Sequence, residues 1–167
     1  RPRPLELRVI DLAATLKLAH STATSALPME AAGVQWQGLH ALVSMMIEAD
    51  QGQMLQVFVI LFENALHALS GCENHICRVH IEKDGTDVTI AVEDSGPGIP
   101  DALRDRIFEP FVTGRKREGN RSGTGLGLAI AKGIVERQQG MISAGTSTLG
   151  GASFVVRLPN MQRIVQG

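Results

Sequence analysis

The stretch DQGQMLQVFVILFENALHALSG, residues 50–71, predicts one long amphipathic helix. Asp50 can cap its first turn, Gln53 can complete a capping box, and Gly71 is a typical residue at which a helix ends. At about 100° per residue, Asn64 lies at the pole opposite the apolar face and is flanked by Ile60, His67 and Ala68. A solvated polar stripe explains this amide and imidazole as well as a binding site does. The apolar face consists of Leu55, Phe58, Val59, Phe62, Leu66 and Leu69.

The composition is that of an ordinary globular domain, with 44% hydrophobic and 20% charged residues among 167. A formal net charge of −1 and few aromatic residues give no sign of nucleic-acid binding. Cys72 and Cys77 suggest neither a disulfide framework nor a zinc site, so we expect reduced thiols and a cytoplasmic setting. No continuous apolar run reaches the roughly 20 residues of a membrane span. We expect one domain over 1–160 and a tail over 161–167.

The order of the predicted elements favours an α+β fold. Hairpins outnumber the helices that could cross over between parallel strands, which argues against a doubly wound sheet. We therefore predict a two-layer α/β sandwich, with a mixed, largely antiparallel sheet packed on about three helices. The elements are a strand over 5–10, a helix over 11–26, extended segments over 33–36 and 40–48, the long helix, a hairpin over 76–93, a helical turn over 101–106, a helix over 126–138 and a hairpin over 140–158.

The sequence DSGPGIP, residues 94–100, directly follows the second strand of the first hairpin. Its glycines allow a ligand to approach the backbone closely, or allow positive φ angles. A carboxylate at Asp94 can accept a hydrogen bond from an amine such as that of adenine, which contributes about 1.5–3 kcal/mol. An ordinary Asp-Ser-Gly turn would contain the same residues, so this motif alone leaves both interpretations open.

The sequence GTGLGLAI, residues 123–130, marks the point where a polar segment becomes a helix. Free N–H groups and the helix dipole at such a junction favour a phosphate. Neither the dinucleotide-binding fingerprint nor the P-loop pattern is present. The preceding stretch, 107–125, predicts a long loop whose basic residues either screen a triphosphate or form a solvated surface. These residues are Arg115, Lys116, Arg117 and Arg121.

Taken in this order, the motifs resemble the ATP-binding catalytic domain of sensor histidine kinases. This domain belongs to the wider GHKL family of gyrase, Hsp90 and MutL. QVFVILFENALHAL at 56–69 resembles the N box, and DSGPGIP resembles the first glycine box. IFEPFVT at 107–113 resembles the F box, and GTGLGLAIAKGIVE at 123–136 resembles the second glycine box. The likeness covers about residues 5–158 and implies a Bergerat-type fold that binds ATP and Mg²⁺.

The resemblance also implies roles for individual residues. Asn64 would be the Mg²⁺ ligand, Asp94 would bind the adenine amine, and 108–122 would form the ATP lid. His67 occupies a position that is often basic near the phosphates, and Ser153 a position that is often Thr near the adenine. The other expected nucleotide-binding residues are Ala68, Gly96, Gly98, Ile99, Phe108, Phe111, Gly123, Thr124, Gly125, Leu126, Gly127 and Leu128.

One departure from the family concerns Ile60. Many histidine kinases have a second Asn at this position, and the ATP-hydrolysing relatives have a Glu that activates water. The catalytic candidates are Asn64 and Glu63, which lies about 100° around the helix from Asn64. Mg²⁺ would then be coordinated by Asn64, the phosphates and water molecules. We expect phosphoryl transfer to a protein rather than steady hydrolysis.

A second departure is that no histidine of the chain is followed by an acidic residue, as the phosphoacceptor usually is. We expect the acceptor on a separate, N-terminal histidine-containing dimerisation domain of the same kinase, with a response regulator as an indirect partner. The fragment itself would be monomeric, and the full-length chain could be anchored in a membrane. Two alternatives remain open: a serine kinase acting on an anti-sigma antagonist, and a nucleotide-binding module without transfer activity.

Overall fold

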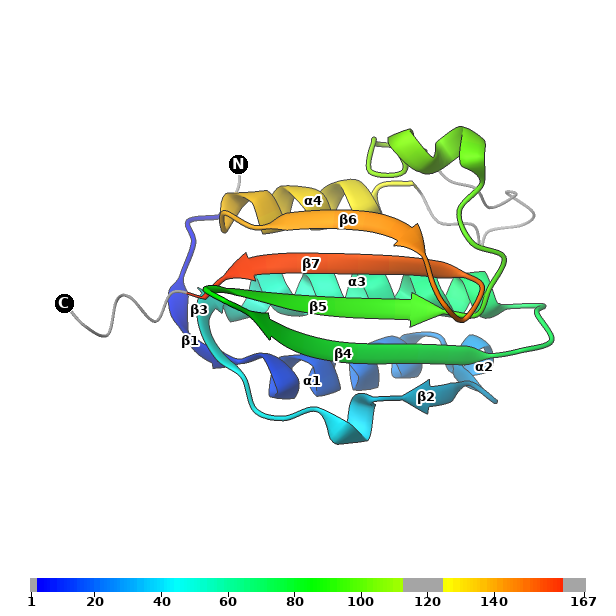
Figure 1. The fold of residues 1–167 in the computed structure, drawn as a ribbon, viewed down its shortest axis with the longest axis horizontal. Coiled ribbons are helices and arrows are strands. Elements are labelled where there is room, and N and C mark those ends of the chain that lie inside the picture. The colour runs from blue at the N-terminus through cyan, green and yellow to red at the C-terminus, as the bar shows by residue number, and fades with distance from the viewer. Residues whose placement is uncertain (1–2, 113–124, 161–167) are drawn as a thin grey trace.

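The computed structural model describes residues 3–112 and 125–160 and has the predicted α+β architecture. A five-stranded sheet covers one side of a helical layer formed mainly by α1, α3 and α4 (Figure 1). The elements are β1 (Leu7–Asp11), α1 (Leu12–Ala26), α2 (Pro28–Ala31), β2 (Gln35–Gln37), η1 (Leu39–Ala41), β3 (Met46–Asp50), α3 (Gln51–Leu69), β4 (Ile76–Asp84), β5 (Asp87–Asp94), η2 (Asp101–Arg106), α4 (Gly127–Arg137), β6 (Met141–Thr146) and β7 (Ala152–Pro159).

The sheet is mixed but largely antiparallel, as the sequence predicts. Its strands lie in the order β2-β4-β5-β7-β6, and only the β2–β4 pair is parallel. The β4–β5 and β6–β7 pairs are the two predicted hairpins. A separate two-stranded ribbon, β1–β3, lies at one end of the domain (Figure 1). Because β5 is central, the residues that follow its last position start near the middle of the sheet edge.

The long helix begins and ends as predicted. Asp50 caps α3 by accepting a hydrogen bond from the Gln53 N–H at 3.0 Å, and Gly71 follows the helix with a φ of +82°. The second half of the expected capping box is missing, because the buried Gln53 Oε1 has no hydrogen-bond partner within the described residues. The Asp50 carboxylate instead accepts a second bond from the Glu6 N–H, which ties the N-terminal segment to α3.

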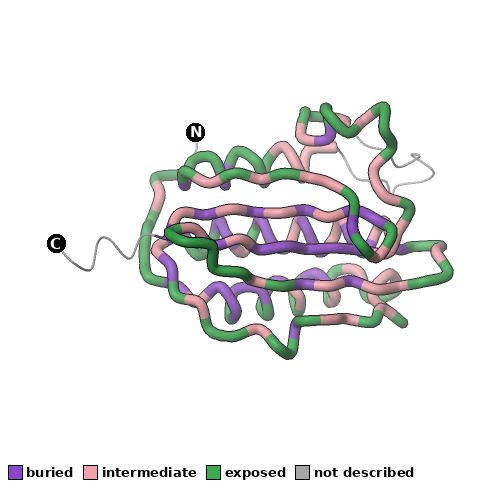
Figure 2. Tube along the Cα trace, in the orientation of Figure 1, coloured by how far each residue is buried: buried purple, intermediate pink, exposed green. Residues whose placement is uncertain are grey.

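The buried face of α3 is wider than the sequence analysis predicts. Phe58, Phe62, Leu66 and Leu69 are buried as expected, whereas Leu55 and Val59 are only partly buried. The helix packs against α1 and α4 as well as the sheet, so its flanks are covered too. Figure 2 shows buried residues on the central strands and on the helix behind them. The additional buried apolar residues are Met54, Val57, Leu61 and Ala65.

The prediction of extended structure over 40–48 is wrong in its first part. Leu39–Ala41 forms a short 3-10 helix, and the strand starts only at Met46. Gly38, with a φ of +83°, causes the change of direction. A Cβ atom at Gly38 would lie 2.1 Å from the Val79 carbonyl oxygen, so only glycine fits against β4 at this place.

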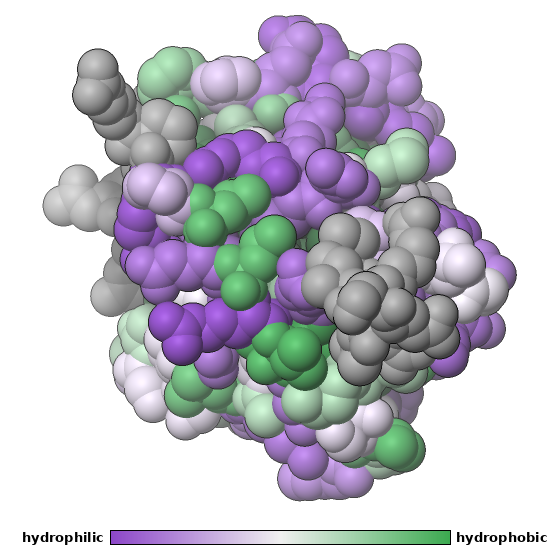
Figure 3. Space-filling view, turned by 90° about the vertical axis from the view of Figure 1, so that its left-hand side faces the viewer, coloured by the Kyte–Doolittle hydropathy of each residue, from purple (hydrophilic) through white to green (hydrophobic). Residues whose placement is uncertain are grey.

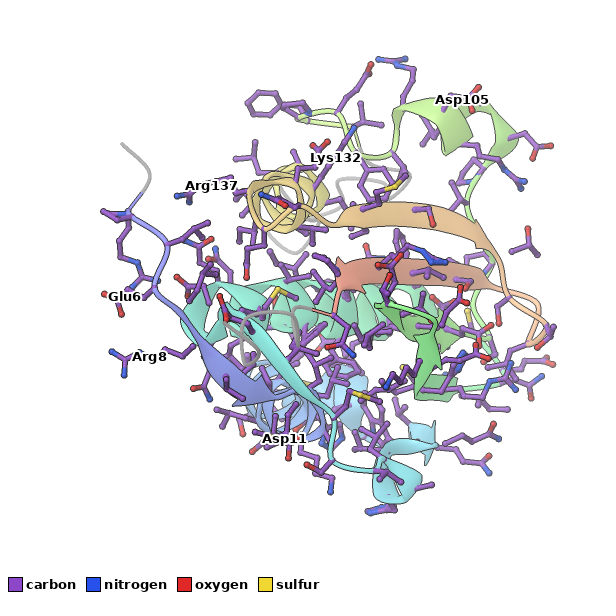
Figure 4. The ribbon with its side chains drawn as sticks, turned by 60° about the vertical axis from the view of Figure 1, so that its left-hand side comes forward. Glu6, Arg8, Asp11, Asp105, Lys132 and Arg137 are labelled. Carbon is purple, nitrogen blue, oxygen red and sulfur yellow. The ribbon has the colours of Figure 1, made fainter. Side chains whose placement is uncertain are left out.

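The β1–β3 ribbon exposes apolar side chains at one end of the domain. Figure 3 shows apolar residues in the middle of this face, surrounded by hydrophilic ones. The large exposed apolar residues of the two strands are Leu7, Val9 and Met46. Glu6 and Arg8 point away from the domain beside them (Figure 4). The segment before β1 is also held by α4, since the Arg137 Nη2 donates to the Arg3 carbonyl at 2.7 Å.

Of the residues that the structure describes, one helix is long and apolar enough to cross a membrane by length and composition. This helix is α3, with 19 residues. Its apolar side chains pack in the core of the domain, and this packing accounts for their number.

Because the core closes around α3, we expect Leu61→Ala to lower the free energy of unfolding by about 2–5 kcal/mol. Leu61 is fully buried, and its truncation leaves a cavity between α3 and its neighbours. The control is Leu18→Ala on α1, where the side chain is 49% exposed, and its cost should stay below about 1 kcal/mol. Urea unfolding followed by circular dichroism measures both values, and equal costs would contradict the packing described here.

Candidate functional site

The end of β5 and the last turns of α3 meet at one edge of the sandwich. Gly96 lies directly on α3, since a Cβ atom there would be 2.9 Å from the Ala68 carbonyl oxygen. Gly98 has a φ of +81° and lies next to the turn between β6 and β7. Ile99 then packs against the edge of the core. The glycine-rich turn after β5 is therefore seated between α3 and the β6–β7 turn.

Asp94 is the buried acid of this edge, with an exposed fraction of 2%. Its Oδ1 accepts hydrogen bonds from the N–H groups of Gly96, at 2.9 Å, and Ala152, at 3.2 Å. Burial raises the pKa of the Asp94 carboxyl, and the two N–H groups offset this effect only in part. Within the described part of the chain only Oδ1 accepts hydrogen bonds, so the geometry leaves Oδ2 available to an external donor.

The start of α4 lies beside α3, one helical turn before Asn64. A Cβ atom at Gly127 would be 3.3 Å from the Ile60 side chain, and Leu128 packs against the core. The first N–H groups of a helix have no acceptor within the helix. These donors therefore begin close to the side of α3 that carries Asn64. The partly exposed side chains of this part of α3 are Ile60, Glu63, Asn64, His67 and Ala68.

The structure separates the two phenylalanines of the F box. Phe108 is partly buried and packs edge-on against Phe154 of β7, with ring centroids 6.3 Å apart. Phe111 is 67% exposed and has a φ of +67°, which is unusual for a residue other than glycine. Its N–H donates to the Gly125 carbonyl at 2.8 Å. This bond joins the F box to the residues just before α4.

Gly125 is the residue that allows this junction. Its φ is +75°, and a Cβ atom would lie 2.6 Å from the Phe111 backbone. Leu126 follows at the position before the first residue of α4, where its side chain makes no capping hydrogen bond. The remaining lid positions, 113–122, and the predicted phosphate-binding residues Gly123 and Thr124 lie outside the described residues.

The expectation that Ser153 lies near the adenine is not met by the register of the sheet. Ser153 pairs with Glu93, whose side chain forms an ion pair with Arg78 on the face away from the helices. Asp94 points to the opposite face, because side chains alternate along a strand. The residue beside Asp94 is Ala152, which is buried. Ser153 is therefore removed from the predicted adenine-binding residues.

The described residues contain no group of three or more His, Cys, Asp or Glu side chains that could hold a metal ion. A cation at Asn64 would thus need ligands from a bound phosphate and from water. Mg²⁺ suits such a site, because it keeps several waters and binds substrate phosphates through few protein groups.

Comparison with known proteins agrees with this geometry. Residues 49–162 match the family described as histidine kinase-, DNA gyrase B-, and HSP90-like ATPase. The chain belongs to this family. Sporulation kinase A of Bacillus subtilis is 34% identical over 116 residues, which are 70% of this chain and 18% of that protein. Sensor histidine kinase ZraS of Salmonella typhimurium is 40% identical over 119 residues, which are 70% of this chain and 24% of that protein.

Solved structures of histidine kinases have the same fold. The nucleotide-free catalytic domain of histidine kinase ThkA superposes with a TM-score of 0.75 at 26% identity, covering 93% of this chain and 98% of that one. Full-length ShkA in complex with AMPPNP gives a TM-score of 0.74 at 25% identity, covering 95% of this chain and 32% of that one. The chain is thus an ATP-binding catalytic domain of the sensor histidine kinase type, and the predicted family and fold are confirmed.

Sequence reasoning missed the contribution of the β6–β7 turn to this site. The Ala152 N–H holds Asp94, and the Gly151 N–H donates to the Asp94 carbonyl at 3.1 Å. The Gly150-Gly151 pair was assigned only to a hairpin. No local signal distinguishes this pair, because two adjacent glycines are also common in an ordinary hairpin turn.

The buried Asp94 leads to a prediction about pH. The raised pKa of Asp94 in the folded state means that its charged form opposes folding. This destabilisation develops as the pH rises from about 4, the unfolded value, through the raised folded pKa, and is constant above it. Asp94→Asn removes the charge and keeps the acceptor oxygen for Gly96 and Ala152. We therefore expect the stability of the variant relative to the wild type to increase over this pH interval.

Urea unfolding at several pH values above about 4 measures this difference. The matched control is Asp101→Asn, because the Asp101 side chain is 99% exposed. Its stability relative to the wild type should change little with pH. A variant Asp94→Asn that loses stability relative to the wild type as the pH rises would contradict the assignment of a buried, unfavourable charge.

Proposed function

We propose that this domain binds Mg·ATP at the edge formed by α3, β5 and α4 and transfers the γ-phosphoryl group to a histidine of a separate domain. The observation that carries the proposal is the Asp94 carboxylate, which is held by two backbone donors with Oδ2 left over. Gly96 and Gly98 in the turn after β5, and Gly127 at the start of α4, keep the backbone of these two segments free of side chains. Such an arrangement fits a flat purine and its phosphates.

Each group then has a distinct task in the reaction. Asp94 accepts a hydrogen bond from the 6-amino group of adenine, and the turn at 96–99 lies along the base. The first N–H groups of α4, from Gly127 and Leu128, face the phosphates together with the favourable end of the helix dipole. Asn64 supplies an amide oxygen to Mg²⁺, which neutralises charge on the phosphates when bound. His67 lies about one turn beyond Asn64 and two turns beyond Ile60, and extends the polar side toward Ala68.

The α3 helix favours transfer over hydrolysis. Ile60 is an apolar side chain packed under the start of α4, so it provides no base for a water. Glu63 is the nearest carboxylate in the sequence of α3 and is partly exposed. In phosphoryl transfer the enzyme mainly positions the groups and stabilises charge, and a protein nucleophile supplies the attacking atom.

The acceptor histidine belongs, in this proposal, to a dimerisation domain of the same kinase outside residues 1–167. The chain spans only 18% and 24% of the two curated relatives named above. Transfer from that histidine to a response regulator would follow, and a membrane-anchored sensor region is part of the same proposal for the whole protein.

The metal role of Asn64 is tested by the variant Asn64→Ala. We expect the gain in ATP affinity on adding magnesium to fall by about 10–100-fold, since even outer-shell partners of a metal contribute this much. ATP binding in EDTA should change little, because the adenine contacts remain. Isothermal titration calorimetry with and without magnesium measures both affinities. Asn74→Ala, at an exposed amide in the loop after α3, is the control and should keep the full magnesium effect.

The transfer itself is tested with the full-length kinase and γ-labelled ATP. We expect an acid-labile, base-stable phosphoprotein, because a phosphohistidine loses its phosphoryl group in acid. An acid-stable product would indicate a serine kinase instead. Intact Mg·ATP binding without any phosphoprotein would contradict the transfer reaction and leave a nucleotide-binding module.

A further inference from the structure

We propose that the β6–β7 turn is a positioning element for adenine selection, and that Gly151 is its key residue. This inference rests on the proposed function, because it concerns how the adenine-binding carboxylate is held. Gly151 lies 57 positions after Asp94 in the chain, and the turn reaches Asp94 because β7 pairs with β5.

Gly151 lies directly against Asp94. A Cβ atom at Gly151 would be 2.2 Å from Asp94 Oδ1, 2.5 Å from the Asp94 carbonyl oxygen and 2.6 Å from the Gly96 nitrogen. All three distances are below 3.0 Å, a separation that real Cβ atoms essentially never show. Two of the three atoms belong to the backbone and cannot rotate away. Any other residue at Gly151 would therefore displace either the turn or Asp94.

The turn also donates the hydrogen bonds that orient Asp94. The Gly151 N–H bonds the Asp94 carbonyl at 3.1 Å, and the next N–H, of Ala152, bonds the carboxylate Oδ1 at 3.2 Å. Together with the Gly96 N–H at 2.9 Å, these donors hold one carboxylate oxygen in place. Because Oδ1 is held, the position of Oδ2 is fixed as well. A small rotation of the carboxylate would misalign Oδ2 with an adenine amine.

Hydrogen bonds within the β6–β7 turn hold its backbone in the conformation that positions Asp94. The buried Ser147 donates its N–H to the Gly151 carbonyl at 2.8 Å, and its own carbonyl accepts from the Gly150 N–H at 3.0 Å. Its hydroxyl accepts from the Leu149 N–H at 2.9 Å. On the far side, Gly98 of the turn after β5 comes near Gly150 and Gly151. The two turns thus form one packed unit on either side of the carboxylate.

A defect in positioning predicts a loss of selectivity for the 6-amino group, which a general loss of structure does not. The test compares ATP with purine riboside 5′-triphosphate, which lacks this amino group, in titrations with magnesium. The wild type should prefer ATP by about 10–100-fold, the value of one hydrogen bond to a charged acceptor. In Gly151→Ala this preference should fall to near unity, while the affinity for purine riboside 5′-triphosphate should stay within about threefold of the wild type.

The matched control is Gly145→Ala in β6 of the same hairpin. A Cβ atom there has no neighbour within 4 Å, so the preference for ATP should be unchanged. Where Gly151→Ala does not fold, Ser147→Ala replaces it, because it removes the hydroxyl that accepts from the Leu149 N–H and so loosens the turn without adding atoms beside Asp94. It should lower the preference for ATP in the same direction.

The double variant Asp94→Ala/Gly151→Ala shows whether Gly151 acts through Asp94. Its preference for ATP should equal that of Asp94→Ala alone, since a residue acting through another adds nothing once the other is removed. A preference that Gly151→Ala leaves at the wild-type level would overturn the inference. Failure of the wild type to bind ATP, or to depend on Asp94, would instead overturn the proposed function.

Discussion

The packing of α3 on three sides is the constraint on which the rest of the structure depends. The helix contacts the sheet, α1 and α4, and its side chains Met54, Val57 and Leu61 are buried in this packing. From Ile60 to Ala68 the helix keeps a row of partly exposed side chains, among them Ile60, Asn64 and His67. The neighbouring elements of α3 therefore determine which of its residues can present polar side chains to a ligand. Both the start of α4 and the end of β5 lie beside this row, so packing alone brings the predicted N box and the two glycine boxes together.

Within this arrangement the carboxylate of Asp94 is a buried charge that the fold stabilises only in part. Two N–H groups satisfy one oxygen, yet burial still raises the pKa. A group of this kind is costly for stability, since an amide of the same shape would keep the hydrogen bonds without the charge. Such a cost is typical of residues kept for binding. The remaining oxygen gains its partner only when a donor arrives from outside, which makes the site selective for ligands that carry one.

How much of this could be predicted from sequence depends on whether the signal was local. Helix periodicity, the Asp50 cap, Gly71 and the two hairpins are local patterns, and they gave the correct elements and the mixed sheet. The motifs also predicted one site for Asp94, Gly96 and Gly127, and the structure places Gly96 against Ala68 and Gly127 against Ile60 of α3. The failures came from contacts distant in sequence. Ser153 was expected near the adenine, but it pairs with Glu93 and not with Asp94, and a one-residue difference in register reverses the side of the sheet. Gly151 was missed because its neighbour, Asp94, is 57 positions away.

Ile60 shows how packing and chemistry restrict each other at this site. Its side chain fills the space below Gly127, and this contact seats the start of α4 against α3. A carboxylate at the same position would have to be desolvated under the helix or would push α4 away. In the first case it would be protonated more readily, and in the second the N–H donors would leave the phosphates. The apolar residue that seats α4 thus also provides no base for a water, and both effects fit the proposed transfer, in which another protein supplies the nucleophile.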